Sequence, residues 1–163
     1  MGKLYFSEEM SQKLSKIYSR GLVMVEAPAG YGKTTAVRWA MRDVPSEQIH
    51  WFTAVTCLQD TSLDWFIRQI GQLDQDAGAA LRQLGFLNRS NVSIAADILA
   101  NLEVSEPCYL IVDNFQFIGD NWPLPLLQAL ADRRRDELHV ILISQNFGKL
   151  RAVFENTTNV YRF

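Results

Sequence analysis

Residues 26–35 read EAPAGYGKTT, and they decide the fold because the apolar run LVMV at 22–25 precedes them and a helical pattern follows. Glycines at 30 and 32 let backbone N–H groups converge on an anion at the N-terminus of that helix. A lysine and a hydroxyl can then complete the shell of a phosphate group. The pattern departs from G-x-x-x-x-G-K-[ST] only at its first position, where Ala27 stands. We therefore predict a phosphate-binding loop between a strand and a helix.

Each side chain of the loop has an expected contact. The backbone N–H groups of residues 29–34 are predicted to turn toward a β-phosphate. Lys33 is expected to reach the β- and γ-phosphates, the Thr34 hydroxyl to ligate Mg²⁺, and Thr35 to meet the α-phosphate. Tyr31 lies inside the loop and is expected to pack beside the nucleotide. The predicted nucleotide-binding residues are Ala29, Gly30, Tyr31, Gly32, Lys33, Thr34 and Thr35.

Length and composition favour one domain in the cytoplasm. The chain has 163 residues, 48% of them hydrophobic and 21% charged, which is enough for a single core. A net charge of −2 gives no basic field, so we expect no direct nucleic-acid binding by this segment. No apolar stretch is long enough for a membrane span or a secretory leader. Cys57 and Cys108 lie apart in apolar surroundings and are expected to be reduced core thiols.

The chain alternates short apolar runs with helical patterns, which is typical of an α/β fold with a parallel sheet. Strands are expected at 22–27, 49–55, 108–113, 138–144 and 159–163, and helices at 7–19, 33–42, 62–73, 92–102 and 124–135. The sequence thus predicts a five-stranded parallel sheet with helices on both faces. Arg133, Arg134 and Arg135 are expected to be solvated at the C-terminal end of the last helix, where they complement its dipole.

A second signal for phosphate chemistry is an acid at the end of another strand. Asp113 follows the apolar run YLIV, about 80 residues beyond the loop. Ligands of such sheets collect at the carboxyl ends of the strands. We therefore predict that Thr34 and Asp113 share one Mg²⁺, and that ATP or ADP is the nucleotide.

Four stretches together resemble the ATPase module of STAND-class signal-transduction regulators, most of all the MalT-like, LuxR-type bacterial transcriptional regulators. They are APAGYGKTT, HWFTAV with Asp60 and the following Trp65 and Phe66, CYLIVDNFQFI, and LHVILIS. The resemblance implies a P-loop NTPase, for which we expect the strand order 5-1-4-3-2, and an ATP- or ADP-dependent switch that controls transcription. It also implies helical, winged-helix, sensor and helix-turn-helix domains, which this sequence lacks, and nucleotide-dependent self-association of the full protein. Residues 1–163 are accordingly expected to be a single nucleotide-binding domain, an excised N-terminal fragment of a larger regulator.

Two residues depart from the pattern that the resemblance implies. Asn114 stands where the family has a second acid able to act on the attacking water, and Gln145 stands at the position of an arginine that senses the γ-phosphate. An amide cannot serve as a general base, and Gln brings no positive charge. Slow hydrolysis, or none, is expected. A small P-loop kinase that transfers a γ-phosphate to a metabolite stays open as the alternative, as does a degenerate module that keeps only the scaffold.

Overall fold

The computed structural model describes residues 21–26, 32–55, 61–133, 137–154 and, for the backbone alone, 160–162. The helix expected at 7–19 lies outside these residues. The strands are β1 (Leu22–Glu26), β2 (Ile49–Thr53), β3 (Cys108–Asp113), β4 (Leu138–Ser144) and β5 (Val160–Arg162). The α-helices are α2 (Lys33–Ala40), α3 (Ser62–Leu73), α4 (Gln75–Leu84), α5 (Val92–Ala100), α6 (Leu124–Asp132) and α7 (Lys149–Phe154). Single turns of 3₁₀-helix are η2 (Ser46–Gln48), η3 (Phe115–Phe117) and η4 (Gly119–Asn121).

All strand pairs are parallel, and the order across the sheet is β2-β3-β4-β1-β5. This is the expected order, read from the other edge. Four strands of five to seven residues form the body of the sheet, and the three-residue β5 extends it beside β1. The register pairs Glu26 with Ser144, and Val112 with Leu142. The residues that follow β1, β3 and β4 therefore emerge at one edge of the sheet.

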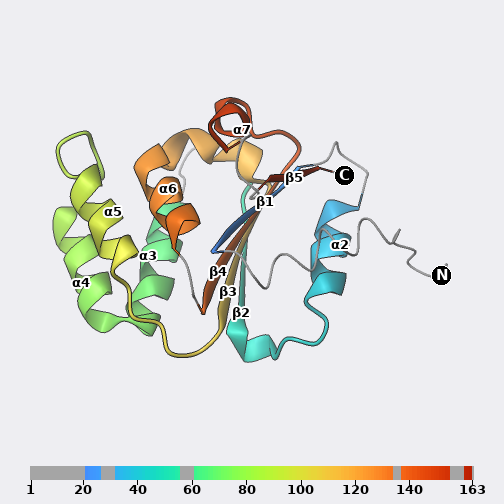
Figure 1. Ribbon diagram of the computed structural model, residues 1–163, viewed down its shortest axis with the longest axis horizontal. Helices are drawn as coiled ribbons and strands as arrows, with labels where there is room; N and C mark the ends of the chain where they lie inside the picture. The colour runs from blue at the N-terminus through green and yellow to red at the C-terminus, as the bar shows by residue number, and fades with distance from the viewer. Residues whose placement is uncertain (1–20, 27–31, 56–60, 134–136, 155–159, 163) are drawn as a thin grey trace.

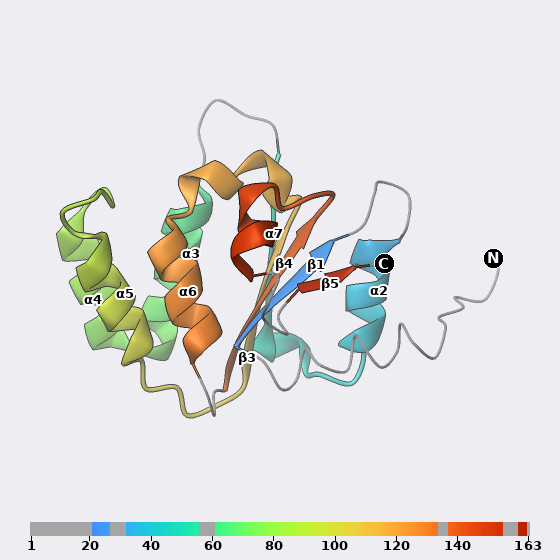
Figure 2. The same ribbon diagram turned by 45° about the horizontal axis from the view of Figure 1, so that its top comes forward.

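Helices cover the sheet on both faces (Figure 1). Val23 and Val25 point to the face covered by α2, whereas Leu22 and Met24 belong to the larger cluster on the face of α3 and α6. Alternate residues of β1 thus enter different clusters, although all are buried, as expected for a strand covered on both faces. Helices α4 and α5 pack against α3 and α6 and form an outer layer, which Figure 2 shows at the far side of α3 and α6 from the sheet.

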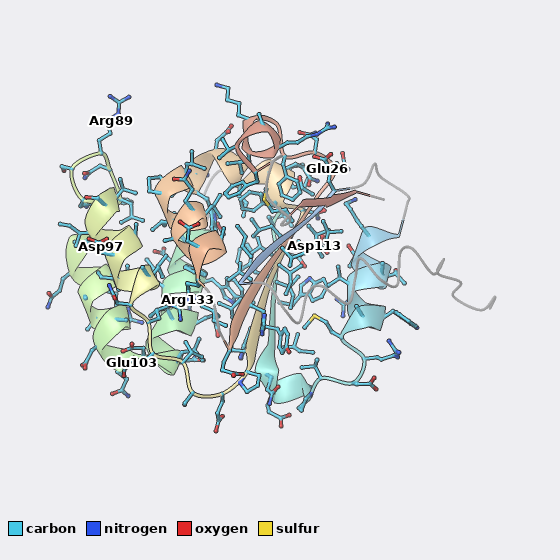
Figure 3. The ribbon with its side chains drawn as sticks, viewed as in Figure 1. Glu26, Arg89, Asp97, Glu103, Asp113 and Arg133 are labelled. Carbon is cyan, nitrogen blue, oxygen red and sulfur yellow. The ribbon has the colours of Figure 1, made fainter. Side chains whose placement is uncertain are left out.

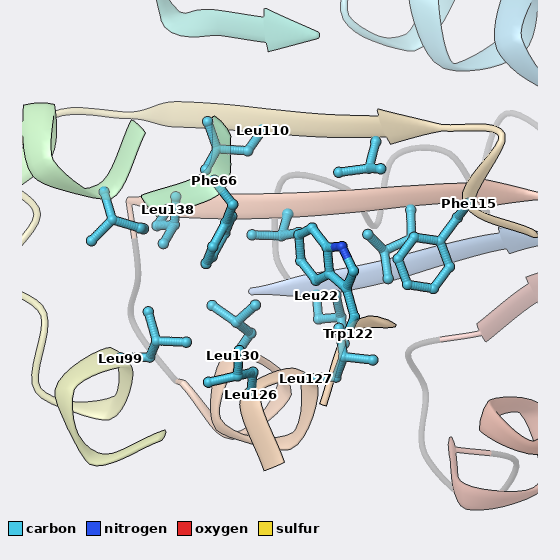
Figure 4. Close-up of a cluster of buried hydrophobic side chains, with 14 of the residues drawn as sticks. Leu22, Phe66, Leu99, Leu110, Phe115, Trp122, Leu126, Leu127, Leu130 and Leu138 are labelled. Carbon is cyan, nitrogen blue, oxygen red and sulfur yellow. The ribbon is translucent and has the colours of Figure 1, made fainter. Parts of the chain in front are cut away.

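The larger core cluster is held by aromatic packing near the carboxyl ends of the strands. The ring of Trp122 lies 5.1 Å from that of Phe66 and 5.7 Å from that of Phe115 (Figure 4). Its indole N–H donates a buried hydrogen bond of 2.8 Å to the Ser62 hydroxyl at the start of α3. The polar edge of the indole therefore has a partner inside the core, as a buried indole requires.

Two helices were absent from the sequence-based prediction. Helix α4 begins two residues after α3 ends, and the Asp74 carboxylate caps it by accepting the Ala77 N–H at 3.1 Å. Helix α7 has only six residues, too few for a clear period. The other described helices begin where expected; α3 also ends where expected, whereas α2, α5 and α6 end two or three residues early. None of the described helices combines the length and the apolar character that a membrane crossing requires.

The expectation that Arg133 is solvated was wrong. Its guanidinium donates hydrogen bonds to the carbonyls of Leu99, in the last turn of α5, and of Leu102, two residues beyond that helix. Because the last carbonyls of a helix have no partner within it, a cation there satisfies them and complements the dipole of α5. Arg133 therefore ties α5 to the end of α6, while Arg134 and Arg135 lie outside the described residues.

Candidate functional site

A hydrogen bond joins the first turn of α2, which follows the predicted phosphate loop, to the acid at the end of β3. The Thr34 hydroxyl donates a hydrogen bond of 2.9 Å to Asp113 Oδ2, although the residues are 79 positions apart. Asp113 is buried, with 5% of its surface exposed. The sheet order produces this meeting, because it brings the ends of β1 and β3 to one edge on either side of β4. Figure 3 labels Asp113 at this edge.

The other carboxylate oxygen of Asp113 also has a partner. Asn114 donates its backbone N–H to Asp113 Oδ1 at 2.8 Å, and its side-chain amide donates to the Ala54 carbonyl at 3.3 Å. Its backbone is left-handed, with φ 58° and ψ 41°, a conformation that Asn adopts more readily than most residues. Asn114 thus turns the chain out of β3 and links β3 to the residue after β2.

The beginning of α2 has the features of an anion-binding helix end. Gly32 precedes the helix with φ 69°, and its carbonyl accepts the first helical hydrogen bond, from Ala36 N–H at 2.8 Å. Lys33 is the first helical residue and only 8% exposed, and no ion pair joins it to a carboxylate in the described part of the chain. A lysine at the N-terminus of a helix, beside its free backbone N–H groups, suits a phosphate. Thr35 is exposed, whereas Ala29, Gly30 and Tyr31 lie outside the described residues.

The donor set at this edge fits Mg²⁺. A threonine hydroxyl and one carboxylate are hard oxygen ligands, and Mg²⁺ is commonly held by one or two carboxylates together with substrate phosphates and water. No cluster of three or more His, Cys, Asp or Glu residues that could hold a metal by itself occurs among the residues described. Thr34 and Asp113 would therefore hold the ion together with a nucleotide.

A further amide, which the sequence reasoning did not single out, links β3 to β4. The side-chain oxygen of Gln116, on η3, accepts the Gln145 backbone N–H at 3.2 Å and the Ser144 hydroxyl at 3.3 Å. The Ser144 hydroxyl also contacts the Asn146 carbonyl. Gln145 itself is exposed. No local pattern marks such a contact, because its partners lie 28 and 29 positions away.

The residue before the phosphate loop reaches the same connection from the other side. Glu26, at the end of β1, is 8% exposed, and its carboxylate accepts the Phe147 N–H at 2.9 Å. Arg151 of α7 lies 3.8 Å from the other oxygen of the carboxylate. Figure 3 labels Glu26 at the end of the sheet near α7. The connection between β4 and α7 is therefore held by side chains from the end of β1 and from η3, which follows β3.

A pocket of about 610 Å³ opens beside this connection. Its walls come from η3, η4, the start of α6, and the segment from Asn146 to α7. Aromatic and aliphatic side chains share the walls with polar ones, among them Gln116, Asp120 and Lys149. Its size is within the range of small-molecule sites.

Comparison with known proteins gives one family. The family model described as "AAA domain" matches residues 15–154, which include the predicted loop, Asp113 and Gln145. A search of curated proteins finds no match.

Proposed function

Because the chain belongs to the AAA domain family and is a P-loop NTPase domain, we propose that it is a nucleotide-controlled switch that binds ATP or ADP with Mg²⁺. One observation carries the proposal: the Thr34 hydroxyl and the Asp113 carboxylate meet at the N-terminus of α2. A helix N-terminus, a lysine and a pair of hard oxygen ligands at one point suit a Mg²⁺–phosphate group. Bound there, the ion would neutralise phosphate charge.

The proposed switch hydrolyses ATP slowly or not at all. The Asn114 amide cannot remove a proton from water, and its hydrogen bond to Ala54 commits it to the turn after β3. Gln145 brings no positive charge to a developing phosphoryl transition state. Each missing group is commonly worth about 10²-fold or more in rate. Binding would therefore persist where catalysis is weak.

The finer assignment is a STAND-class, MalT-like regulator of transcription. It is supported by the four sequence stretches that carry the resemblance, among which CYLIVDNFQFI includes Asp113, Asn114 and Gln116. In this proposal the nucleotide state passes to other domains of the same polypeptide, and the segment does not itself contact nucleic acid.

The alternative is a small P-loop kinase. The observation that favours it is the 610 Å³ pocket beside the β4–α7 connection, which is large enough for a metabolite. Phosphate release under saturating Mg-ATP, with and without candidate acceptors, separates the two functions. A switch gives turnover far below about 1 per second, whereas an enzyme reaches about 1 to 10³ per second.

Calorimetric titration with ATP and ADP tests the proposed binding. Lys33→Ala is expected to abolish binding, because it removes the cation at the start of α2. Arg89→Ala is the matched control, since it removes one positive charge from an exposed residue of the outer layer, as Figure 3 shows. Chelation of Mg²⁺ should weaken binding by the parent chain and leave Asp113→Ala unaffected. Equal affinity of parent and Lys33→Ala would contradict the proposal.

A further inference from the structure

The connection between β4 and α7 lies between the two parts of the proposed nucleotide site. β4 has β1, which leads into the phosphate loop, on one side and β3, which ends at Asp113, on the other. Ligands of open parallel sheets bind outside the carboxyl ends of the strands. A phosphate that extends beyond the loop toward Asp113 would therefore approach the residues after β4, of which Gln145 is the first.

Two side-chain acceptors fix the backbone of this connection. Glu26 accepts the N–H of Phe147, and Gln116 accepts the N–H of Gln145. The hydroxyl of Ser144, a residue with no exposed surface, lies 3.3 Å from the same Gln116 oxygen and closer to the Asn146 carbonyl, and its single proton serves one of the two acceptors at a time. Glu26 belongs to the strand that precedes the loop, whereas Gln116 lies three residues after Asp113 on η3. Gln116 therefore sets where Gln145 stands relative to Asp113.

We propose that Gln116 is a positioning residue through which the site distinguishes ATP from ADP. The inference deepens the proposed nucleotide switch and rests on it. In this proposal the loop holds the phosphates that ATP and ADP share, Lys33 reaches the β- and γ-phosphates, and Gln145, whose backbone Gln116 fixes, contacts the phosphate that only ATP has. Release of the Gln145 backbone weakens the contact to the γ-phosphate and leaves the shared contacts intact.

The test is the ratio of two affinities, measured by calorimetry for ADP and for a non-hydrolysable ATP analogue. Gln116→Met removes the acceptor oxygen at nearly constant side-chain length. We expect the affinity for the analogue to fall about 3- to 10-fold, the range of one or two hydrogen bonds, and the ADP affinity to stay within about twofold. Gln83→Met is the matched control, because Gln83 is exposed on α4 in the outer layer, and its ratio should equal that of the parent.

Ser144→Ala is the second variant, and it decides the question if Gln116→Met does not fold. It removes the hydroxyl that contacts the Gln116 side-chain oxygen and the Asn146 carbonyl, next to Gln145, and leaves the Gln145 N–H contact in place. The backbone of Gln145 is then less constrained, so the ratio should shift in the same direction by about two- to threefold. A folded Gln116→Met that weakens both nucleotides equally, or neither, overturns the inference, because a purely structural residue gives that result. If Gln116→Met does not fold, an unchanged ratio of the two affinities in Ser144→Ala overturns the inference. Absence of nucleotide binding by the parent chain contradicts the proposed switch itself and, with it, this inference.

Discussion

At the scale of the residue, Asn114 has two functions in the turn after β3. Among the described residues it is the only non-glycine with positive φ, and its side chain bridges to the strand edge at Ala54. The left-handed backbone by itself would suit Asp as well as Asn. The hydrogen bond to the Ala54 carbonyl requires Asn, because a carboxylate cannot donate to a carbonyl. Geometry thus explains an amide at this position without reference to catalysis.

Asn114→Asp is therefore expected to destabilise the chain and to leave phosphate release slow. The new carboxylate would face the Ala54 carbonyl, which loses its donor, so we expect a loss of about 1–3 kcal/mol in the free energy of unfolding. Urea denaturation measures it. Asn146→Asp is the control, because it adds the same charge to an exposed residue near the same edge. Faster phosphate release at unchanged stability would show that residue 114 has access to the attacking water.

The sequence identified the polar residues of this edge unevenly. Thr34 and Asp113 could be predicted as neighbours, because each belongs to a strand-end pattern and a parallel sheet brings strand ends together. The contacts of Gln116 and Glu26 could not be predicted from the sequence. Their partners are backbone N–H groups of a distant connection, and no spacing in the sequence encodes a contact over 29 or 121 positions.

At the scale of the element, α3 and α4 approach each other where both have a glycine. A Cβ added to Gly78 would lie 2.4 Å from the Gly71 Cα, whereas one added to Gly71 would lie 3.7 Å from the Gly78 Cα. The first distance requires the backbones to separate, and the second is an ordinary contact. The close packing of the two helices therefore depends on Gly78 rather than on Gly71.

The two glycines provide a matched pair of alanine variants. Gly71→Ala should raise the melting temperature by about 2–4 °C, because alanine gains up to about 1 kcal/mol over glycine inside a helix. Gly78→Ala should lower it, because the displaced helices lose contacts that exceed this gain. Thermal denaturation followed by circular dichroism measures both. A stabilised Gly78→Ala would mean that α3 and α4 stand farther apart than this structure has them.

Helix α4 also shows where element prediction failed and why. Its sequence, QDAGAALRQL, has three alanines and only two large apolar residues, Leu81 and Leu84, so the helical stripe is weak. Asp74 was the available signal, since Asp is among the preferred residues at a helix N-cap. The strands were predicted well because their apolar runs are nearly continuous and are bounded by polar residues.

At the scale of the whole molecule, global stability is linked to a buried thiol at the start of β3. Cys108 begins β3 and is 3% exposed, and burial raises the pKa of its thiol from the ordinary 9.0 to about 11. The unfolded chain therefore ionises this group at a lower pH than the folded chain. The contribution to stability is complete below pH 9 and is lost as the pH rises toward about 11.

Comparison with Cys108→Ala isolates this effect. The variant lacks the thiol and keeps every other ionisable group, so parent and variant should show a constant difference in the free energy of unfolding up to about pH 8. Between pH 9 and 11 the parent should lose more stability than the variant. Urea titrations at pH 8, 9 and 10 measure how the free energy of unfolding of parent and variant changes with pH. Parallel curves would show that the Cys108 thiol ionises as easily in the folded chain as in the unfolded one.

The outer layer of α4 and α5 has a consequence for how the molecule opens. These helices rest on α3 and α6, and Arg133 ties the end of α5 to the layer beneath. Proteins open in cooperative units, and the units with the fewest connections to the centre open first. We therefore expect the layer to form its own unit of amide exchange, whose protons are replaced while those of β3 and β4 stay protected. Thermal fluctuation in this region would leave the edge where Thr34 meets Asp113 undisturbed.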